Sequence, residues 1–293
     1  MPSLVGKAGL ERANGRMQAA DQLVQNFIAT PIGGLLFAVA IAVPVLVTGA
    51  GFLVAAVLAL TLPVAAGRAL AEPDTAVVST SARADFREAF TYLFGHRLLR
   101  NLVLVTGGIG SMLTLAQAAA VLFFLDTLSV PAAFIGFVTA GVGLGGLTGA
   151  LLASTLVARF GRGKVMLAAL LVASLALLAT GLSPNVWLAT AAYAVGAGAV
   201  TVWNVPWGAL RQDIVPGRLL GRVTGLNRSL VWGSFVLSGL LGGLLARIDL
   251  CLPFLVGGIA SLIVTALAIK LVLSVDARHA AETERRAEQE ITG

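Results

Sequence analysis

The most concentrated set of side chains that could do chemistry is a polar stripe near the start of the chain. Its members are Asn14, Gln18, Asp21, Gln22 and Gln25, and their spacing places them on one helical face. Asn26 lies beside the stripe. An aspartate at the centre of an apolar helix costs roughly 2.5–3.5 kcal/mol on insertion scales, so the stripe should face water or a partner helix. We expect a substrate or proton pathway with Asp21 as the protonatable group. The alternative is an Asp21 that is simply hydrated one turn inside the membrane surface.

A second set of polar side chains interrupts later apolar segments. Gln117 shares a helical face with Gly110 and Thr114. The glycines around position 110 would let that helix bend, or would only allow close packing. Gln117 is a candidate for the substrate pathway.

Aromatic and basic side chains supply the remaining binding candidates, which are Trp203, Asn204 and Arg228. An asparagine beside two tryptophans and a proline could bind a bulky organic substrate. The alternative for Trp203 and Trp207 is an aromatic belt at the membrane surface. Arg228 would either face the cavity and attract anions or extend to the interface.

Two short basic connections have a mechanical interpretation. Charged pairs formed between them would hold one face of the molecule closed and break when it opens. The residues concerned are Arg159, Arg162 and Lys164 in the first connection, and Arg211, Asp213, Arg218 and Arg222 in the second. Orientation in the membrane alone would also explain this positive charge.

The sequence offers little to enzyme or metal chemistry. It holds no H-E-x-x-H, no G-x-S-x-G and no paired carboxylates within its apolar segments, and we expect no catalytic site, no metal and no cofactor. The single cysteine excludes an internal disulfide, and the two histidines are expected to be solvated. Gly141–Gly146 formally fits a dinucleotide fingerprint, but it lies inside an apolar helix without a preceding strand. Gly141, Gly145 and Gly149 instead predict a smooth helix-packing surface.

The composition is that of an integral membrane protein. Of the 293 residues, 58% are hydrophobic and 12% are charged, whereas soluble domains average about 25% charged. A spanning helix needs about 20 mostly apolar residues. The sequence therefore predicts an all-α membrane protein with eight spans, at residues 17–40, 43–66, 101–125, 132–156, 165–183, 185–210, 224–246 and 251–274.

The basic residues predict the orientation. With eight spans, every Lys and Arg except Arg247 falls on one side, which the positive-inside rule makes cytoplasmic. Both termini and the 67–100 loop are then cytoplasmic, and the net charge of +6 needs no nucleic-acid partner. Within that loop, residues 84–94 predict an amphipathic helix, either on the membrane surface or as an ordinary linker. The charged tail 276–293 is expected to be a frayed helix or disordered.

A duplication sets the architecture. At an offset of 209 residues, Gly33-Gly34-Leu35-Leu36 meets Gly242-Gly243-Leu244-Leu245, and Pro44 and Gly49 meet Pro253 and Gly258. The first two spans therefore repeat the last two, and the repeating unit is six helices. Two six-helix units of the same orientation are typical of one large class of secondary transporters.

At this point the chain resembles the major facilitator superfamily, in particular its bacterial efflux subgroup of enterobactin-exporter and macrolide-efflux-like proteins. The resemblance rests on several segments in the right order: Met1–Val5 with Leu10–Asn14, Thr30–Gly34, Arg159–Lys164 and Val215–Val223. Two of them depart from the family pattern, with Thr30 in place of a glycine and Ala158 in place of an acidic residue.

The resemblance implies a domain plan and a function. Residues 1–66 would be helices five and six of the family fold, 67–100 the central cytoplasmic loop, 101–275 the complete C-terminal six-helix half, and 276–293 a tail. Four helices would be absent, and Met1 would match an internal methionine of a longer protein. The implied function is proton-coupled export of amphiphilic small molecules across a bacterial inner membrane, by a monomer when complete. The alternative is a non-transporting fragment, or one half of a split transporter.

Overall fold

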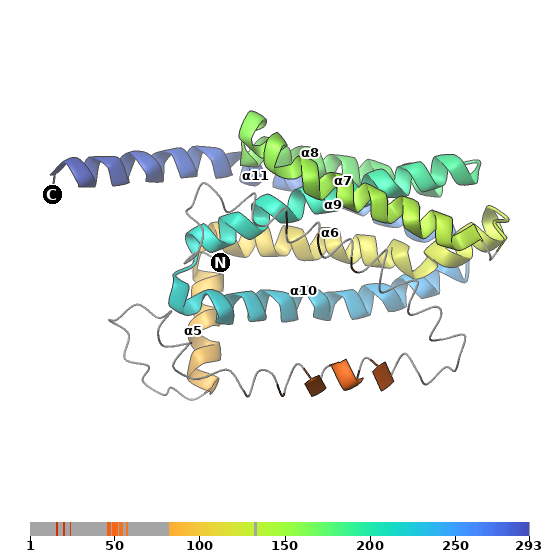
Figure 1. Cartoon of the computed structure of the whole chain (residues 1–293), viewed down its shortest axis with the longest axis horizontal. Coiled ribbons are helices and arrows are strands. Elements are labelled where there is room, and N and C mark those ends of the chain that lie inside the picture. Colours follow the sequence, from red (N-terminus) through yellow and green to blue (C-terminus); the bar gives the residue numbers. More distant parts are fainter. Residues whose placement is uncertain are drawn as a thin grey trace.

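The structure is a bundle of long helices without strands among the residues that it describes (Figure 1). The computed structural model describes residues 82–131 and 134–292, together with a few isolated positions before residue 58. Apart from those isolated positions, the first two expected spans, 17–40 and 43–66, lie outside the described residues. In chain order the described elements are α5 (Ala82–Gly95), α6 (Arg97–Leu122), a π-helical turn η3 (Phe123–Thr127), α7 (Ile135–Phe160), α8 (Arg162–Gly181), α9 (Val186–Ile214), α10 (Gly217–Ala246) and α11 (Leu252–Thr292).

Within the described residues, six helical segments are long and apolar enough to cross a membrane: Arg97–Thr127, Ile135–Phe160, Arg162–Gly181, Val186–Ile214, Leu219–Ala246 and Leu252–Val275. Each overlaps one of the last six predicted spans, which confirms those predictions and the all-α membrane class. Large apolar side chains cover the outside of the bundle; Phe137 is 73% exposed and Leu267 is 81% exposed. Such a surface suits lipid and not water.

Local signals begin and end these helices. His96 Nδ1 accepts a hydrogen bond from the Leu99 amide at the start of α6, and Asn185 Oδ1 accepts one from Leu188 at the start of α9. His96 is therefore a partly exposed helix cap. Gly161 alone connects α7 to α8, and its φ of 85° is a conformation that glycine adopts without strain.

Glycines set how closely the helices approach. A Cβ on Gly145 or Gly149 of α7 would collide with the carbonyls of Ala194 and Gly198 of α9. This confirms the packing interpretation of the glycine-rich stretch, with α9 as the partner. Gly242 and Gly258, which belong to the sequence repeat, lie against Leu115 of α6 and Leu178 of α8. These two repeated glycines are thus helix contacts, whereas Gly243 beside them faces open space.

The segment 84–94, predicted as an amphipathic helix, and the charged tail from residue 276 are both helical in the structure. α5 crosses the end of the bundle instead of running along it, next to the start of α10 (Figure 1). Ala89 and Leu93 of α5 are buried, whereas Phe86 and Phe90 are exposed. At the other terminus α11 continues as a helix to Thr292, beyond the ends of the other helices (Figure 1). The domain boundaries predicted from the family resemblance stay a prediction.

Candidate functional site: an open cavity between three spans

A cavity of about 630 Å³ lies between α6, α9 and α10, with α8 behind it. This volume is in the range of small-molecule sites, roughly 300–1,000 Å³. Its lining includes Thr106, Gly110, Thr114 and Gln117 of α6, Trp203, Asn204, Trp207 and Arg211 of α9, and Thr224, Asn227, Arg228, Trp232 and Phe235 of α10. The exposed side chains at its open side are those of Gln117, Arg228 and Trp232.

The α6 wall is less polar than its sequence suggests. The hydroxyls of Thr106 and Thr114 donate to the carbonyls of Leu102 and Gly110, at 2.8 Å and 2.9 Å. Such bonds within the helix occupy the hydroxyl protons. The exposed Gln117 amide is therefore the main donor from α6. The Phe235 ring fills the space beside Gly110, where a Cβ would lie only 2.7 Å from it, so this glycine packs against α10.

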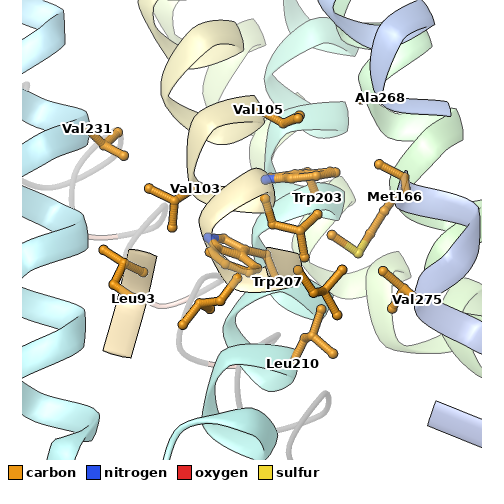
Figure 2. Close-up of a cluster of buried hydrophobic side chains, with 14 of the residues drawn as sticks. Leu93, Val103, Val105, Met166, Trp203, Trp207, Leu210, Val231, Ala268 and Val275 are labelled. Atoms are coloured by element: carbon orange, nitrogen blue, oxygen red, sulfur yellow. The ribbon is translucent and has the colours of Figure 1, made fainter. Parts of the chain in front are cut away.

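The α9 wall carries two buried tryptophans. Trp203 and Trp207 are each 4% exposed and lie at the centre of the large apolar cluster that joins most of the helices (Figure 2). Side chains of a membrane-surface belt would be exposed at the interface. The aromatic-belt interpretation of this pair is therefore wrong. Pro206 between them leaves the Val202 carbonyl without its helical donor, a usual cause of local bending.

Two polar atoms on uncharged side chains of the lining have no protein partner. Trp203 Nε1, a donor, and Asn227 Oδ1, an acceptor, are both buried and make no hydrogen bond. Buried polar groups are nearly always paired, so each such exception invites water or a ligand. Together they offer one donor and one acceptor to a molecule in the cavity.

Two arginines give the cavity its charge, and each lies over a tryptophan. The Arg211 guanidinium carbon is 5.6 Å from the Trp207 ring centre, and that of Arg228 is 4.8 Å from Trp232. Both distances are within the range of cation–π attraction. Arg211 Nε is also buried without a partner. No acidic side chain lines the cavity in the described part of the chain, so its lining is positive.

The structure therefore brings together four residues that the sequence singled out separately: Gln117, Trp203, Asn204 and Arg228. The other four, Asp21, Gln22, Gln25 and Asn26, lie outside the described residues. Sequence reasoning did not select Trp232 and Phe235. Their spacing of four and seven residues from Arg228 places them on the same helical face, which was the available signal.

One buried ion pair joins the two basic connections. Arg162 Nη1 is 2.8 Å from Asp213 Oδ2, and the two side chains are only 10% and 13% exposed. Arg222 makes a second, half-exposed pair with Glu88 of α5 at 3.2 Å. Tyr92 of α5 donates to the Ile214 carbonyl at 3.0 Å. Four helices, α5, α8, α9 and α10, are thus linked at the basic end of the bundle.

The remaining gate candidates lie elsewhere. Arg159 is exposed over the Phe160 ring at 5.3 Å, and the exposed Lys164 borders an apolar groove between α7, α8 and α9. Arg211 lines the cavity and is not a member of the Arg162–Asp213 ion pair. Of the side chains predicted for gating, Arg162 and Asp213 form the buried link and Arg222 a surface one.

Comparison with known proteins agrees with this architecture. A sequence profile of the Major Facilitator Superfamily matches residues 109–292. The enterobactin exporter EntS of Escherichia coli strain K12 is 29% identical over 286 residues, which are 96% of this chain and 65% of the relative. EntS of Escherichia coli O1:K1 / APEC is 30% identical over 247 residues, 83% of this chain and 56% of the relative. The chain thus spans less than two thirds of the length of these curated relatives.

The profile match begins within α6 and covers every later span, in the order that the sequence predicted. It includes α9 and α10, which supply most of the cavity lining. The chain belongs to the Major Facilitator Superfamily.

Proposed function

We propose that this chain is part of a secondary active transporter that exports amphiphilic small molecules carrying negative charge and aromatic surface. One observation carries the substrate class: both arginines of the cavity lie over tryptophan rings, and no acidic side chain among the described residues accompanies them. The names of the relatives, which are enterobactin exporters, support the outward direction.

The lining suits such a ligand in two ways. Guanidinium groups are weakly hydrated and present several fixed donors, so they bind carboxylates and other planar anions well. Trp232 and Phe235 offer ring faces and edges to the apolar part of the ligand. Cation–π attraction is worth about 0.5–2 kcal/mol depending on solvent exposure. A ligand anion would add a stronger, charge-assisted bond to the same guanidinium.

The last turn of α9 connects the cavity to the ion pair. Arg211 lines the cavity, Asp213 pairs with Arg162, and the Ile214 carbonyl accepts from Tyr92. A ligand that draws Arg211 into the cavity therefore acts on the helical turn that holds the gate. In this mechanism, ligand binding and breakage of the Arg162–Asp213 pair favour the same rearrangement.

Proton entry is proposed as the driving step, with Asp21 as the protonated carboxylate. The proposed location is a bacterial inner membrane, with both termini cytoplasmic and one copy per complete transporter. Transport also requires that other helices close the open side of the cavity, where Arg228 and Trp232 are exposed. The second candidate is that this chain is one half of a transporter and does not transport without further helices. The exposure of Arg228 and Trp232 at the open side of the cavity supports this candidate as well.

A binding experiment with two dyes of opposite charge tests the substrate class. The full chain is reconstituted in nanodiscs, and tryptophan quenching is measured with anilinonaphthalene sulfonate and with ethidium. The anion should bind more tightly, and Arg228→Ala or Arg211→Ala should weaken it about tenfold, which corresponds to about 1.4 kcal/mol. Arg247→Ala, at the opposite end of the bundle, is the matched control and should change nothing. Preferential ethidium binding, or equal effects of Arg228→Ala and Arg247→Ala, would contradict the proposal.

Transport itself is tested in liposomes with an imposed pH gradient. Uptake of the anionic dye should follow the gradient in the wild type, and Asp21→Asn should remove that dependence while leaving dye binding intact. Uptake only after co-reconstitution with additional transporter helices would favour the second candidate.

A further inference from the structure

A second hollow of about 570 Å³ lies between α6 and α10, separate from the cavity described above. We propose that it binds one anionic phospholipid, with an acyl chain in the groove and the phosphate at Arg100. This site does not depend on what the central cavity transports.

The body of the groove is apolar and small residues shape it. Gly107 and Gly108 of α6 leave its floor open, and Leu104, Leu230 and Leu237 form its rim with exposed fractions of 61%, 40% and 66%. These leucines continue into the exposed apolar surface of α10 through Leu241 and Leu244. The rim therefore opens onto the part of the bundle that suits lipid.

The hydroxyl groups in the groove are already bonded within the protein. Ser111 donates to Ser234 at 2.9 Å, Ser234 donates to the Val231 carbonyl at 2.7 Å, and Ser238 donates to the Ser234 carbonyl at 3.0 Å. An occupant thus meets no unsatisfied hydroxyl proton here. An alkyl chain fits this lining, whereas a polar ligand would lose its own hydrogen bonds.

One end of the groove carries a positive charge. Arg100 Nη1 donates to the Phe94 carbonyl and its Nε to Asn101 Oδ1, both at 3.3 Å, so these two hydrogen bonds go to neutral oxygens. No acidic side chain lines the groove within the described residues. A half-buried arginine between spans at the basic end of a bundle is the arrangement that recognises anionic headgroups.

The helix that crosses the bundle end marks the headgroup level. α5 contributes Leu93 and Phe94 to the groove, beside Arg100. Phe94 lies 4.3 Å from Phe90, ring centre to centre, and Phe90 lies 6.1 Å from Phe86. Phe86 and Phe90 are exposed, as expected for an amphipathic helix at the membrane surface. The phenylalanines of α5 and Arg100 thus lie where the lipid headgroup would be, and the apolar groove continues from them to receive the acyl chain.

Lipid retention measured by native mass spectrometry tests the proposal on the complete 293-residue chain. The protein is purified from nanodiscs that contain phosphatidylglycerol and phosphatidylcholine with identical acyl chains. We expect one phosphatidylglycerol retained per protein, with at least a tenfold preference over phosphatidylcholine. Arg100→Gln should reduce retention about tenfold, while Arg97→Gln, an exposed arginine three residues away, is the matched control and should not.

A groove-filling variant tests the acyl-chain part. Gly107→Leu places its Cβ at an ordinary 3.8 Å from Val231 and extends the side chain into the groove. It should abolish retention, whereas Gly243→Leu, with open space around its Cβ, should not. Equal retention of both lipids, or no effect of Arg100→Gln and Gly107→Leu, would overturn the proposal.

The competing occupant is another helix of the transporter. In a Cys251→Ser background, which removes the only native thiol, a cysteine at Leu237 is paired with cysteines placed singly along residues 17–66. Efficient crosslinking to any of them would show that protein covers the groove and would refute lipid binding there. Reaction of the Leu237→Cys thiol with a lipid-soluble maleimide and the absence of crosslinks would support it.

Discussion

Arg162 Nη1 donates to Asp213 Oδ2 over 2.8 Å, which ties the first residue of α8 to the last turn of α9. Both side chains are mostly buried, and the other carboxylate oxygen, Asp213 Oδ1, has no partner. The Asp213 carboxylate therefore relies on Arg162 for its charge compensation. Removing one member should affect the molecule more than removing a surface charge.

We predict that Arg162→Gln destabilises the protein and alters transport. Loss of one partner of a buried ion pair typically costs about 3–5 kcal/mol, because the remaining charge is left uncompensated. The measurement is the midpoint of thermal unfolding in detergent, together with transport rate in the complete transporter. Arg159→Gln, an exposed arginine over Phe160, is the control and should stay close to wild type. Unchanged transport in Arg162→Gln would remove the gating role.

A double-mutant cycle with Asp213→Asn separates the pair from other effects. If the two side chains act through each other, the double variant should be less destabilised than the sum of the single variants, with a coupling of about 0.5–3 kcal/mol. Additive effects would mean that Arg162 acts through different neighbours.

Gly145→Ala is predicted to loosen the α7–α9 contact. Its new methyl group would collide with the Ala194 carbonyl, which belongs to the backbone and cannot rotate away. Overpacking of this kind costs about 1–3 kcal/mol. Gly243→Ala, where the new Cβ meets nothing within 4 Å, should instead gain up to about 1 kcal/mol from helix propensity. Equal unfolding midpoints for the two variants would contradict the proposed role of Gly145.

Tyr92→Phe is predicted to weaken the attachment of α5 to the end of α9. The variant loses the hydrogen bond to the Ile214 carbonyl, worth about 1 kcal/mol. Burial raises the pKa of the Tyr92 phenol above its ordinary 10.0. Because the folded pKa is the higher one, the phenol's contribution is complete below pH 10 and is lost as the pH rises through the folded pKa. The stability difference between wild type and Tyr92→Phe should therefore shrink above pH 10, and a constant difference would contradict it.

Cys251 offers a test of orientation. It lies between α10 and α11, beside the end of α8 that is opposite Arg162, as the contact of its carbonyl with Gly181 shows. A membrane-impermeant maleimide should label it from outside intact cells. Labelling only after permeabilisation would reverse the proposed orientation, in which the basic end is cytoplasmic.

The rate of that labelling should depend on Asp249. Burial raises the pKa of the Cys251 thiol, and the hydrogen bond and charge of Asp249 raise it further. The thiolate is the reactive form, so labelling at pH 7 should be slow and should accelerate at higher pH. Asp249→Asn removes the charge and should increase the rate at pH 7. The Arg247→Gln variant is a nearby control that leaves the Asp249 carboxylate in place.

The six later spans and the class of fold could be predicted from local sequence, because hydropathy over about 20 residues decides whether a helix enters the membrane. The same holds for the packing role of Gly145 and Gly149, since small residues at i and i+4 share one helical face. The repeat and the motif order pointed to the family that the profile match then showed. In each case the information lies within one helix or in the order of helices.

Only the tertiary structure decided which of the polar side chains meet. Gln117, Trp203 and Arg228 come from three helices that are far apart in sequence, and their convergence depends on how α6, α9 and α10 pack. For the same reason Trp207 is a buried cavity residue and not part of a surface belt. Helix packing also determines that Arg211 faces the cavity, whereas Arg162 forms the ion pair with Asp213. The periodicity of one helix states which side chains share a face, but the neighbouring helices determine what that face contacts.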